Sequence, residues 1–234
     1  GCAGHSAIRT PTLDQLAANG VRFPNAYSEC PVCVPARRTL MTGLMPHEHG
    51  LLQNGPRPMP AVPTVARAFS QAGYQTFAVG KLHVHPQRDR IGFDDVLLDE
   101  EGRASHGDDY ELFLGDRGHP GQRFAGGMCN NEYLWRPWHL HEELHVTNWA
   151  AQQMSRQIVR RDPGRPAFWY LSFSHPHPPL SVLAAYLDLY RDINPPPASV
   201  ARWAEGAIEA LPVALGREIQ QMRDANRMVG DEEV

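Results

Sequence analysis

The sequence contains a single lysine, Lys81, among its 22 Lys and Arg residues. Its net charge of −4 offers no basic surface for nucleic acid. No apolar run approaches the ~20 residues that a membrane-spanning helix needs. Its four cysteines lack the regular spacing of a disulfide scaffold, and we find no internal repeat or low-complexity tract. With these classes excluded, the composition indicates a globular protein, since 42% hydrophobic and 21% charged residues are typical of that class.

The most informative segment runs from Cys33 to Gly43, where Pro35 and Arg37 follow the cysteine closely. Proline is favoured in the first turn of a helix, and Gly43 can adopt the left-handed backbone that ends one. We therefore expect Cys33 at a helix N-terminus, where free N–H groups and the helix dipole favour negative charge. Arg37 adds a forked cationic donor for an oxyanion. The segment predicts a nucleophile beside an anion site.

The spacing of Cys30 and Cys33 also occurs in redox pairs and in halves of zinc sites. A zinc site would need a second pair of ligands at a recognisable spacing, whereas Cys2 and Cys129 are isolated. A Cys30–Cys33 disulfide stays open at this point, and it would disable the nucleophile.

Hydrophobic periodicity and Gly/Pro punctuation predict alternating helices and strands. Helices are expected over 11–19, 63–72 and 144–161, and strands over 74–79 and 167–173. The second strand is a continuous apolar run, which favours burial on both faces. The order of elements predicts an α/β fold with a largely parallel sheet flanked by helices. Residues 100–143 lack a clear period and are interpreted as an irregular insertion near the site, and 195–197 as a stiff loop.

Both predicted strands end in residues that can carry positive charge: Lys81 and His83 after the first, His175 and His177 after the second. Ligands of open α/β sheets bind beyond the carboxyl ends of the strands, so these side chains are expected to share a pocket with Cys33. The lone lysine is either a chance of composition or an ammonium that a guanidinium cannot replace. If each segment stays extended, alternate residues point the same way.

Cys-x-Pro-x-Arg followed by Leu-x-Thr-Gly resembles the signature of type I sulfatases, the formylglycine-dependent, arylsulfatase-like family of the alkaline phosphatase superfamily. Residues 10–27, 46–50, 73–83 and 172–179 also resemble segments of that family, so the similarity covers most of 4–100 and about 144–180. Ala36 stands where many members have serine. The cysteine, proline and arginine of the maturation motif are all present.

The resemblance implies that a formylglycine-generating enzyme oxidises Cys33 to formylglycine (3-oxoalanine). One hydroxyl of the hydrated aldehyde would attack the sulfur of a sulfate ester and displace the alcohol. Arg37 and Lys81 would offset charge on the sulfate, and His177 with Lys81 would contact the sulfate and the departing oxygen. His83 would take the proton from the second hydroxyl, so that the aldehyde forms again and sulfate leaves.

The resemblance also implies a calcium ion, or another divalent cation, bound against the formylglycine at position 33. The family's carboxylate ligands lie outside the stretch seen here. Residues 1–234 are therefore expected to be the N-terminal part of a sulfatase catalytic domain, incomplete at both ends and inactive by itself. Localisation stays open between a periplasmic or secreted and a cytoplasmic protein.

Three other functions are compatible with the sequence. They are a phosphonate or phosphate ester hydrolase of the same superfamily, a non-catalytic anion-binding module with unmodified Cys33, and a structural cysteine in a chance pattern. The motifs do not fix whether the substrate is a small-molecule or a carbohydrate sulfate ester. Tyr133, Trp135 and Trp138 would either stack on a ring of the substrate or pack onto the domain. The histidines of the insertion are interpreted as loop residues, since they lack the tight spacing of metal ligands.

Overall fold

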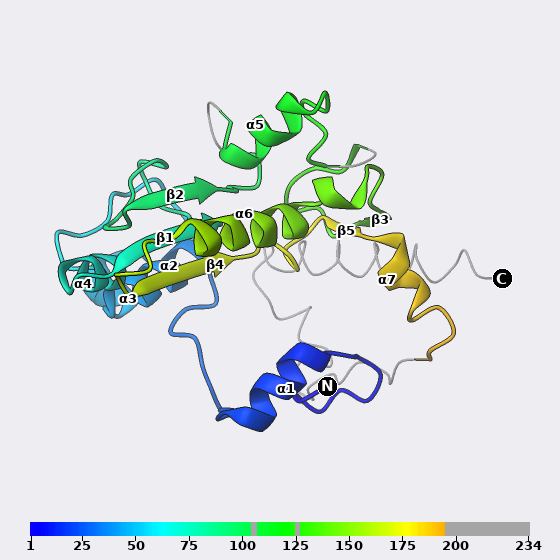
Figure 1. The fold of residues 1–234 in the computed structure, drawn as a ribbon, viewed down its shortest axis with the longest axis horizontal. Coiled ribbons are helices and arrows are strands. Elements are labelled where there is room, and N and C mark those ends of the chain that lie inside the picture. Colours follow the sequence, from blue (N-terminus) through cyan, green and yellow to red (C-terminus); the bar gives the residue numbers. More distant parts are fainter. Residues whose placement is uncertain (104–106, 125–126, 195–234) are drawn as a thin grey trace, which may run out of the picture. The chain divides into compact units, whose positions relative to one another are not determined.

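The computed structural model describes residues 1–103, 107–124 and 127–194 (Figure 1). The chain divides into two compact units. One comprises Tyr27–Glu132 and Arg136–Ser181 and carries the main sheet; the other comprises Gly1–Ala26, Tyr133–Trp135 and the chain from Val182. Within the described ranges, no helix is both long and apolar enough to cross a bilayer. The predicted loop at 195–197 lies outside the described residues.

The main sheet has three strands in the order β2-β1-β4: β1 is Gln75–Gly80, β2 is Asp95–Leu98 and β4 is Ala167–Ser172. Both pairings are parallel, with Gly80 opposite Leu98 on one side and Ser172 on the other. The α/β prediction is thus confirmed. Because the strands run the same way, the residues that follow all three meet at one edge, which we call the carboxyl edge.

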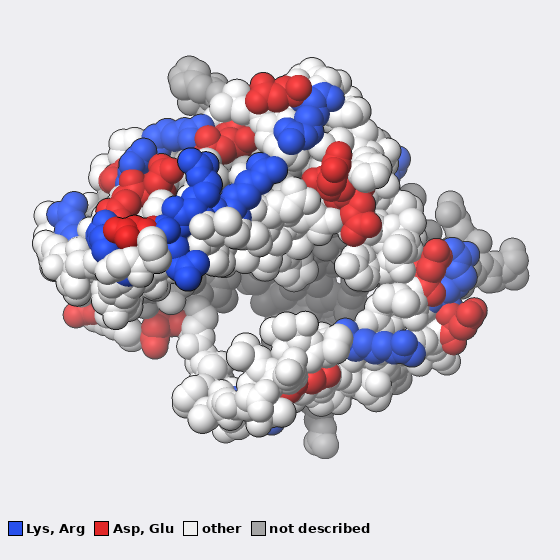
Figure 2. Space-filling view, in the orientation of Figure 1, with Lys and Arg blue, Asp and Glu red and all other residues white. Residues whose placement is uncertain are grey.

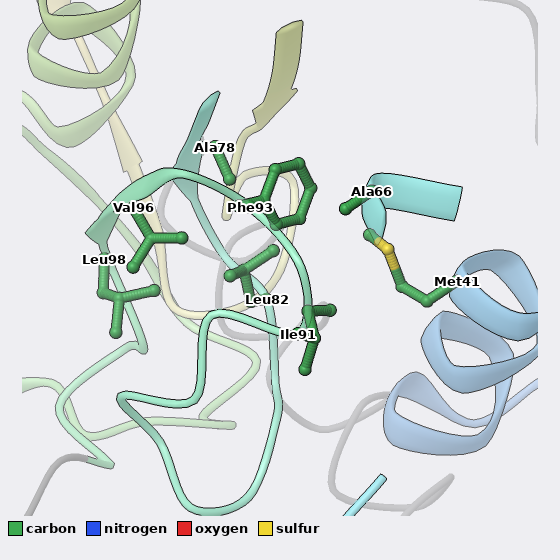
Figure 3. Packing of buried hydrophobic residues seen from close by; sticks show 8 residues of the cluster. All are labelled: Met41, Ala66, Ala78, Leu82, Ile91, Phe93, Val96 and Leu98. Atoms are coloured by element: carbon green, nitrogen blue, oxygen red, sulfur yellow. The ribbon is translucent and has the colours of Figure 1, made fainter. Parts of the chain in front are cut away.

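Helices cover both faces of this sheet (Figure 1). Helices α2 (Cys33–Thr42), α3 (Pro46–His49) and α4 (Val65–Gln71) lie behind it, and α6 (Val146–Arg160) lies in front. The buried cluster on the first face joins α2, α4, β1 and β2 (Figure 3). Its members are Met41, Ala66, Ala78, Leu82, Ile91, Phe93, Val96 and Leu98. Burial of this apolar surface fixes α2, and with it Cys33, against the sheet.

Helix α2 begins at Cys33 and ends before Gly43, whose φ of 72° is left-handed. Both predictions are confirmed. Helix α6 is amphipathic and buries Val146, Trp149 and further residues on one face. It starts two residues later than expected, because the His145 side chain accepts the N–H of Thr147 as a cap after a short 3₁₀ turn, η2 (Glu142–Leu144).

Other expectations need correction. The helix expected over 63–72 spans Val65–Gln71, since Thr64 lies before it and caps it through the N–H of Arg67. Strand β4 is not buried on both faces: each residue is at least partly exposed, because β4 pairs only with β1 and forms an edge of the described sheet. Strand β2 was not predicted. The insertion at 100–143 is not wholly irregular, as it contains α5 (Asp109–Asp116), which Asp108 caps.

The second unit contains two short helices, α1 (Pro11–Asn19) and α7 (Ala184–Asp188). The bounds of α1 match the prediction, although Thr10 donates its hydroxyl to the Asp14 side chain and does not cap the helix. Outside the main sheet, β3 (Trp135–Pro137) and β5 (Leu180–Val182) form a two-stranded sheet.

Candidate active site at the carboxyl edge

Arg37 connects the helix that Cys33 opens to the carboxyl edge of the sheet. It lies one turn after Cys33 on α2, and its Nη1 donates to the carbonyl oxygen of Lys81 at 2.7 Å and to Ser172 Oγ at 2.9 Å. Lys81 follows β1 and Ser172 ends β4, so a single guanidinium joins three elements. One arm of Arg37 is therefore a structural link. That Cys33 shares a pocket with Lys81 stays a prediction.

The turn after β1 requires glycine at position 80. Gly80 has a φ of 103°, and a Cβ there would lie 1.8 Å from the carbonyl oxygen of Ser172. This close approach lets the backbone N–H of Lys81 donate to the same oxygen at 3.0 Å. The chain then turns Lys81 into the protein, where only 3% of the residue is exposed.

Lys81 and His177 face the same carboxylate. Lys81 Nζ lies 2.7 Å from Glu101 Oε1, and His177 Nδ1 lies 3.5 Å from that oxygen. His177 Nδ1 is also 2.8 Å from the carbonyl oxygen of Pro178, to which it donates. The two side chains, which follow β1 and β4, therefore do not point to opposite faces of the sheet.

His83 is held in an unexpected conformation. Its φ of 56° is left-handed, so the segment from Lys81 does not stay extended, and the condition for Lys81 and His83 to point the same way is not met. Its backbone N–H donates to Glu100 Oε1 at 3.0 Å, and its Nε2 lies 2.7 Å from Arg103 Nη1. Burial lowers the pKa of His83 to about 4, although Glu101 opposes this. The ring is thus neutral at neutral pH, with Nε2 accepting from Arg103.

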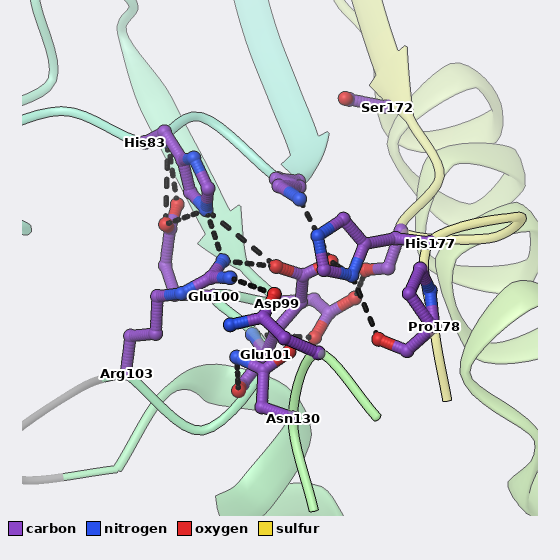
Figure 4. A network of polar contacts seen from close by, with 12 residues as sticks. His83, Asp99, Glu100, Glu101, Arg103, Asn130, Ser172, His177 and Pro178 are labelled. Carbon is purple, nitrogen blue, oxygen red and sulfur yellow. Dashed lines mark hydrogen bonds and ion pairs between the residues drawn. The ribbon is translucent and has the colours of Figure 1, made fainter. Parts of the chain in front are cut away.

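The sequence reading missed the acidic run that follows β2, which comprises Asp99, Glu100 and Glu101. Figure 4 shows it between His83 and His177. Burial raises the pKa of Glu100 to about 7. Burial would also raise the pKa of Glu101, but its hydrogen bond and ion pair with Lys81 outweigh burial and hold this pKa below its usual range. The sequence does contain a signal for this acidic run: the short apolar segment that begins at Val96 is followed directly by acids up to Glu101.

A buried arginine anchors this acidic run. Arg123 is 7% exposed and contacts Asp99, Asp108 at 2.8 Å and Glu111 at 2.6 Å. Asp99 also accepts the hydroxyl proton of Ser174, in the loop after β4. Arg123 thus holds the insertion and, through Asp99, the loop that carries His177.

His175 does not share the partners of His177. The segment after β4 turns, with the N–H of His177 donating to Ser174 O at 3.0 Å, so it does not stay extended. The His175 ring lies 5.2 Å from the His145 ring, and neither of its nitrogens has a hydrogen-bond partner among the described residues. Burial lowers its pKa to about 4. His177 is therefore the better placed candidate.

The described residues do not offer a calcium site. No group of three His, Cys, Asp or Glu side chains within them could hold a metal ion. Two of the three carboxylates of the acidic run already have cationic partners: Arg123 binds Asp99, and Lys81 and Arg103 bind Glu101. On the face drawn in Figure 2, positive and negative side chains are interspersed.

All four cysteines are free, so no disulfide joins Cys30 to Cys33.

A hollow of about 520 Å³ lies at the carboxyl edge, beside His83 and Glu100. Val34, which follows Cys33, lines it together with His83, Gln87 and Arg103. Its volume is in the range of small-molecule sites.

The aromatic candidates behave differently. Trp138 is 9% exposed and its Nε1 donates to His141 O, so it packs into the domain. Tyr133 and Trp135 are exposed.

His49, near the end of the signature segment, is buried beside Thr39, with 3.2 Å between His49 Nε2 and Thr39 Oγ1.

Comparison with known proteins assigns the family. The Sulfatase family model matches residues 1–230. The chain belongs to the sulfatase family. It is 36% identical over 220 residues to an arylsulfatase of Clostridium perfringens, covering 87% of this chain and 46% of that protein. It is 28% identical over 194 residues to a choline-sulfatase of Rhizobium meliloti, covering 79% of this chain and 37% of that protein.

A solved structure is similar over much of the chain. The phosphonate monoester hydrolase of Agrobacterium radiobacter aligns with a TM-score of 0.69 and 25% identity, covering 88% of this chain and 44% of that one. This sulfatase chain thus spans less than half the length of these relatives.

Proposed function

We propose that this sulfatase chain belongs to an enzyme that hydrolyses sulfate monoesters through a formylglycine derived from Cys33. The supporting observation is the convergence of α2, β1 and β4 through Arg37, which places the helix opened by Cys33 at the edge where Lys81 and His177 meet. We take residues 1–234 as part of one catalytic domain. The reaction breaks the bond between sulfur and the alcohol oxygen and releases the alcohol and sulfate.

The residues present suit this modification. Cys33 is a free, partly exposed thiol at the start of α2, followed by Pro35 and Arg37. Formylglycine at this position would supply, as its hydrate, the hydroxyl that attacks sulfur. The dipole of α2 favours the negative charge of a sulfate there, although Asn54 Oδ1 already accepts the N–H of Val34 and Pro35 has none. No step is assigned to calcium, because the described residues do not form a site for it.

Each remaining residue has a role that its surroundings permit. Lys81 and Arg37 offset charge on the sulfate oxygens and the nucleophile. His177 donates Nδ1–H to Pro178, and in its doubly protonated form it would give the Nε2 proton to the departing oxygen, which leaves as the alcohol. His83 is neutral, as a group that takes a proton must be, and Arg103 has to release Nε2 before it can do so.

We place the organic part of the ester in the hollow beside His83. The side chains that line it in the described chain include no Phe, Tyr or Trp, and burial raises the pKa of Glu100, also in its lining, to about 7. Quaternary ammonium groups are bound chiefly by aromatic faces. We therefore expect choline sulfate to be a poorer substrate than an aryl or sugar sulfate.

Three variants of the full-length protein test the proposal with an aryl sulfate. Cys33→Ala should abolish turnover, because it removes the atom that becomes the attacking hydroxyl. Cys33→Ser should accept sulfate but fail to release it, since serine has no second hydroxyl. Cys30→Ala is the matched control and should retain activity, as Cys30 lacks the Pro and Arg spacing. Full activity of Cys33→Ala, or a loss confined to Cys30→Ala, would refute the assignment.

The second candidate is hydrolysis of phosphonate or phosphate monoesters. It is favoured by the similarity to the Agrobacterium phosphonate monoester hydrolase. The two kinds of ester have similar shapes and differ in charge. Turnover of an aryl sulfate and an aryl phosphonate by the same preparation, compared as kcat/KM, decides between them. A protein that binds these anions without turning them over, and whose Cys33 keeps its sulfur, would be an anion-binding module.

A further inference from the structure

The Glu101 carboxylate lies at the centre of the candidate anion site. Oε1 is 2.7 Å from Lys81 Nζ and 3.5 Å from His177 Nδ1. Oε2 contacts Arg103 Nη1 and lies 3.6 Å from His83 Nε2. Only 4% of the residue is exposed. One buried carboxylate therefore touches three of the groups to which the sulfate chemistry is assigned.

The backbone of Glu101 is constrained to make these contacts. Its φ is 56°, in the left-handed region that residues other than glycine rarely adopt. His83 has the same unfavourable backbone, with a φ of 56°. Such a conformation is strained and persists only where surrounding contacts impose it. Asn130 Nδ2 donates to the carbonyl oxygen of Glu101 at 3.2 Å and is one such contact.

We propose that Glu101 is a positioning residue of the anion site, whose carboxylate holds the ammonium group of Lys81 in place for the substrate. This inference rests on the proposed function, because Lys81 and His177 are its sulfate-contacting groups. A lysine that is 3% exposed needs a partner to stay charged. Burial lowers the pKa of Lys81, and the hydrogen bond from Lys81 to Glu101 is the main opposing effect.

The charged and titratable groups around Lys81 come from four elements. Helix α2 and the loops after β1, β2 and β4 contribute Cys33, Arg37, His83, Glu101, Arg103 and His177. Among these, Glu101 is the carboxylate that contacts Lys81 directly. Its removal should therefore make Lys81 release its proton at a lower pH.

The test uses the full-length protein and the variants Glu101→Gln and Glu101→Asp. Reaction of the Lys81-containing peptide with an amine reagent, followed by mass spectrometry against pH, gives the protonation midpoint of Lys81 without any turnover. We expect the midpoint to fall by about one pH unit or more in Glu101→Gln. Glu101→Asp, whose shorter carboxylate lies farther from Lys81, should give a smaller shift in the same direction. The alkaline limb of kcat/KM for an aryl sulfate should move with the midpoint.

Glu111→Gln is the matched control, since Glu111 also pairs with a buried cation, Arg123, but does not contact Lys81 or His177. It should leave the midpoint unchanged. A purely structural role of Glu101 would lower activity at every pH and leave the midpoint in place, which would overturn the inference. Tighter inhibition by inorganic sulfate with higher turnover in Glu101→Gln would also overturn it, by showing that the carboxylate competes with the substrate. If Glu101→Gln does not fold, an unshifted midpoint in Glu101→Asp refutes the inference alone.

The labelling result separates this inference from the proposed function. A shifted midpoint in a protein that hydrolyses no sulfate ester would support the role of Glu101 and reject the sulfatase activity. An unshifted Lys81 midpoint in a protein that does hydrolyse a sulfate ester would support the sulfatase activity and reject the role of Glu101.

Discussion

Replacement of Arg123 by methionine should destabilise the protein severely. Arg123 is 7% exposed, and its guanidinium lies 4.7 Å from the centre of the Tyr110 ring and pairs with three carboxylates. Two of these, Asp99 and Asp108, are 1% and 0% exposed, so water cannot replace the lost partner. Removing one member of a buried ion pair costs about 3 to 5 kcal/mol. Methionine keeps much of the apolar stem, so most of the loss should come from the unpaired carboxylates.

Urea unfolding of the full-length protein measures this loss. Arg117→Met is the matched control: Arg117 is exposed and stacks on Phe113, with 3.8 Å to the ring centre, and its loss should cost about 0.5 kcal/mol or less. The destabilisation by Arg123→Met should be smaller at pH 5 than at pH 8, because the unpaired carboxylates can take up protons.

The same variant should loosen the loop that carries His177, since Asp99 holds Ser174. Amide hydrogen exchange over residues 173–181 should therefore become faster in Arg123→Met and not in Arg117→Met. A loss of less than about 1 kcal/mol, equal to that of the control, would refute the view that Arg123 anchors the carboxyl edge.

Two further variants test individual contacts. Burial raises the pKa of Glu100 from 4.5 to about 7, so the protein loses stability as pH rises from about 4.5 to 7, where the unfolded chain has released this proton and the folded protein still holds it. Glu100→Gln should avoid a loss of about 3 kcal/mol, and its Tm advantage over the parent should grow between pH 5 and pH 8. An advantage that shrinks over this range would contradict the assignment. Gly80→Ala should cost about 3 kcal/mol or more in urea unfolding, because the Cβ would overlap Ser172 O, whereas Gly55→Ala, with no atom within 4 Å, should be close to neutral. Equal losses would show that the backbone at Gly80 can relax.

The elements that the sequence predicted well have local signals at both ends. Helix α2 follows from Pro35 near its start and Gly43 after its end, and β1 from an apolar run that ends at Gly80. Strand β2 has four residues and α5 eight, too few for their periodicity to stand out.

The candidate site was predictable only in part. Lys81, His83 and His177 could be chosen because each follows a predicted strand. Glu101 and Arg103 could not, since their contacts with Lys81 and His83 join residues about twenty positions apart. The left-handed backbone of His83 and Glu101 is imposed by such long-range contacts, and no local sequence preference predicts it.

The central claim is that Cys33 becomes the nucleophile of a sulfate ester hydrolase. The most direct measurement is the mass of the Cys33-containing peptide from active, full-length protein made in a host with a formylglycine-generating enzyme. We predict that the peptide has lost the cysteine sulfur and carries an aldehyde that reacts with a hydrazide probe. An intact Cys33 thiol in a preparation that hydrolyses an aryl sulfate would contradict the account.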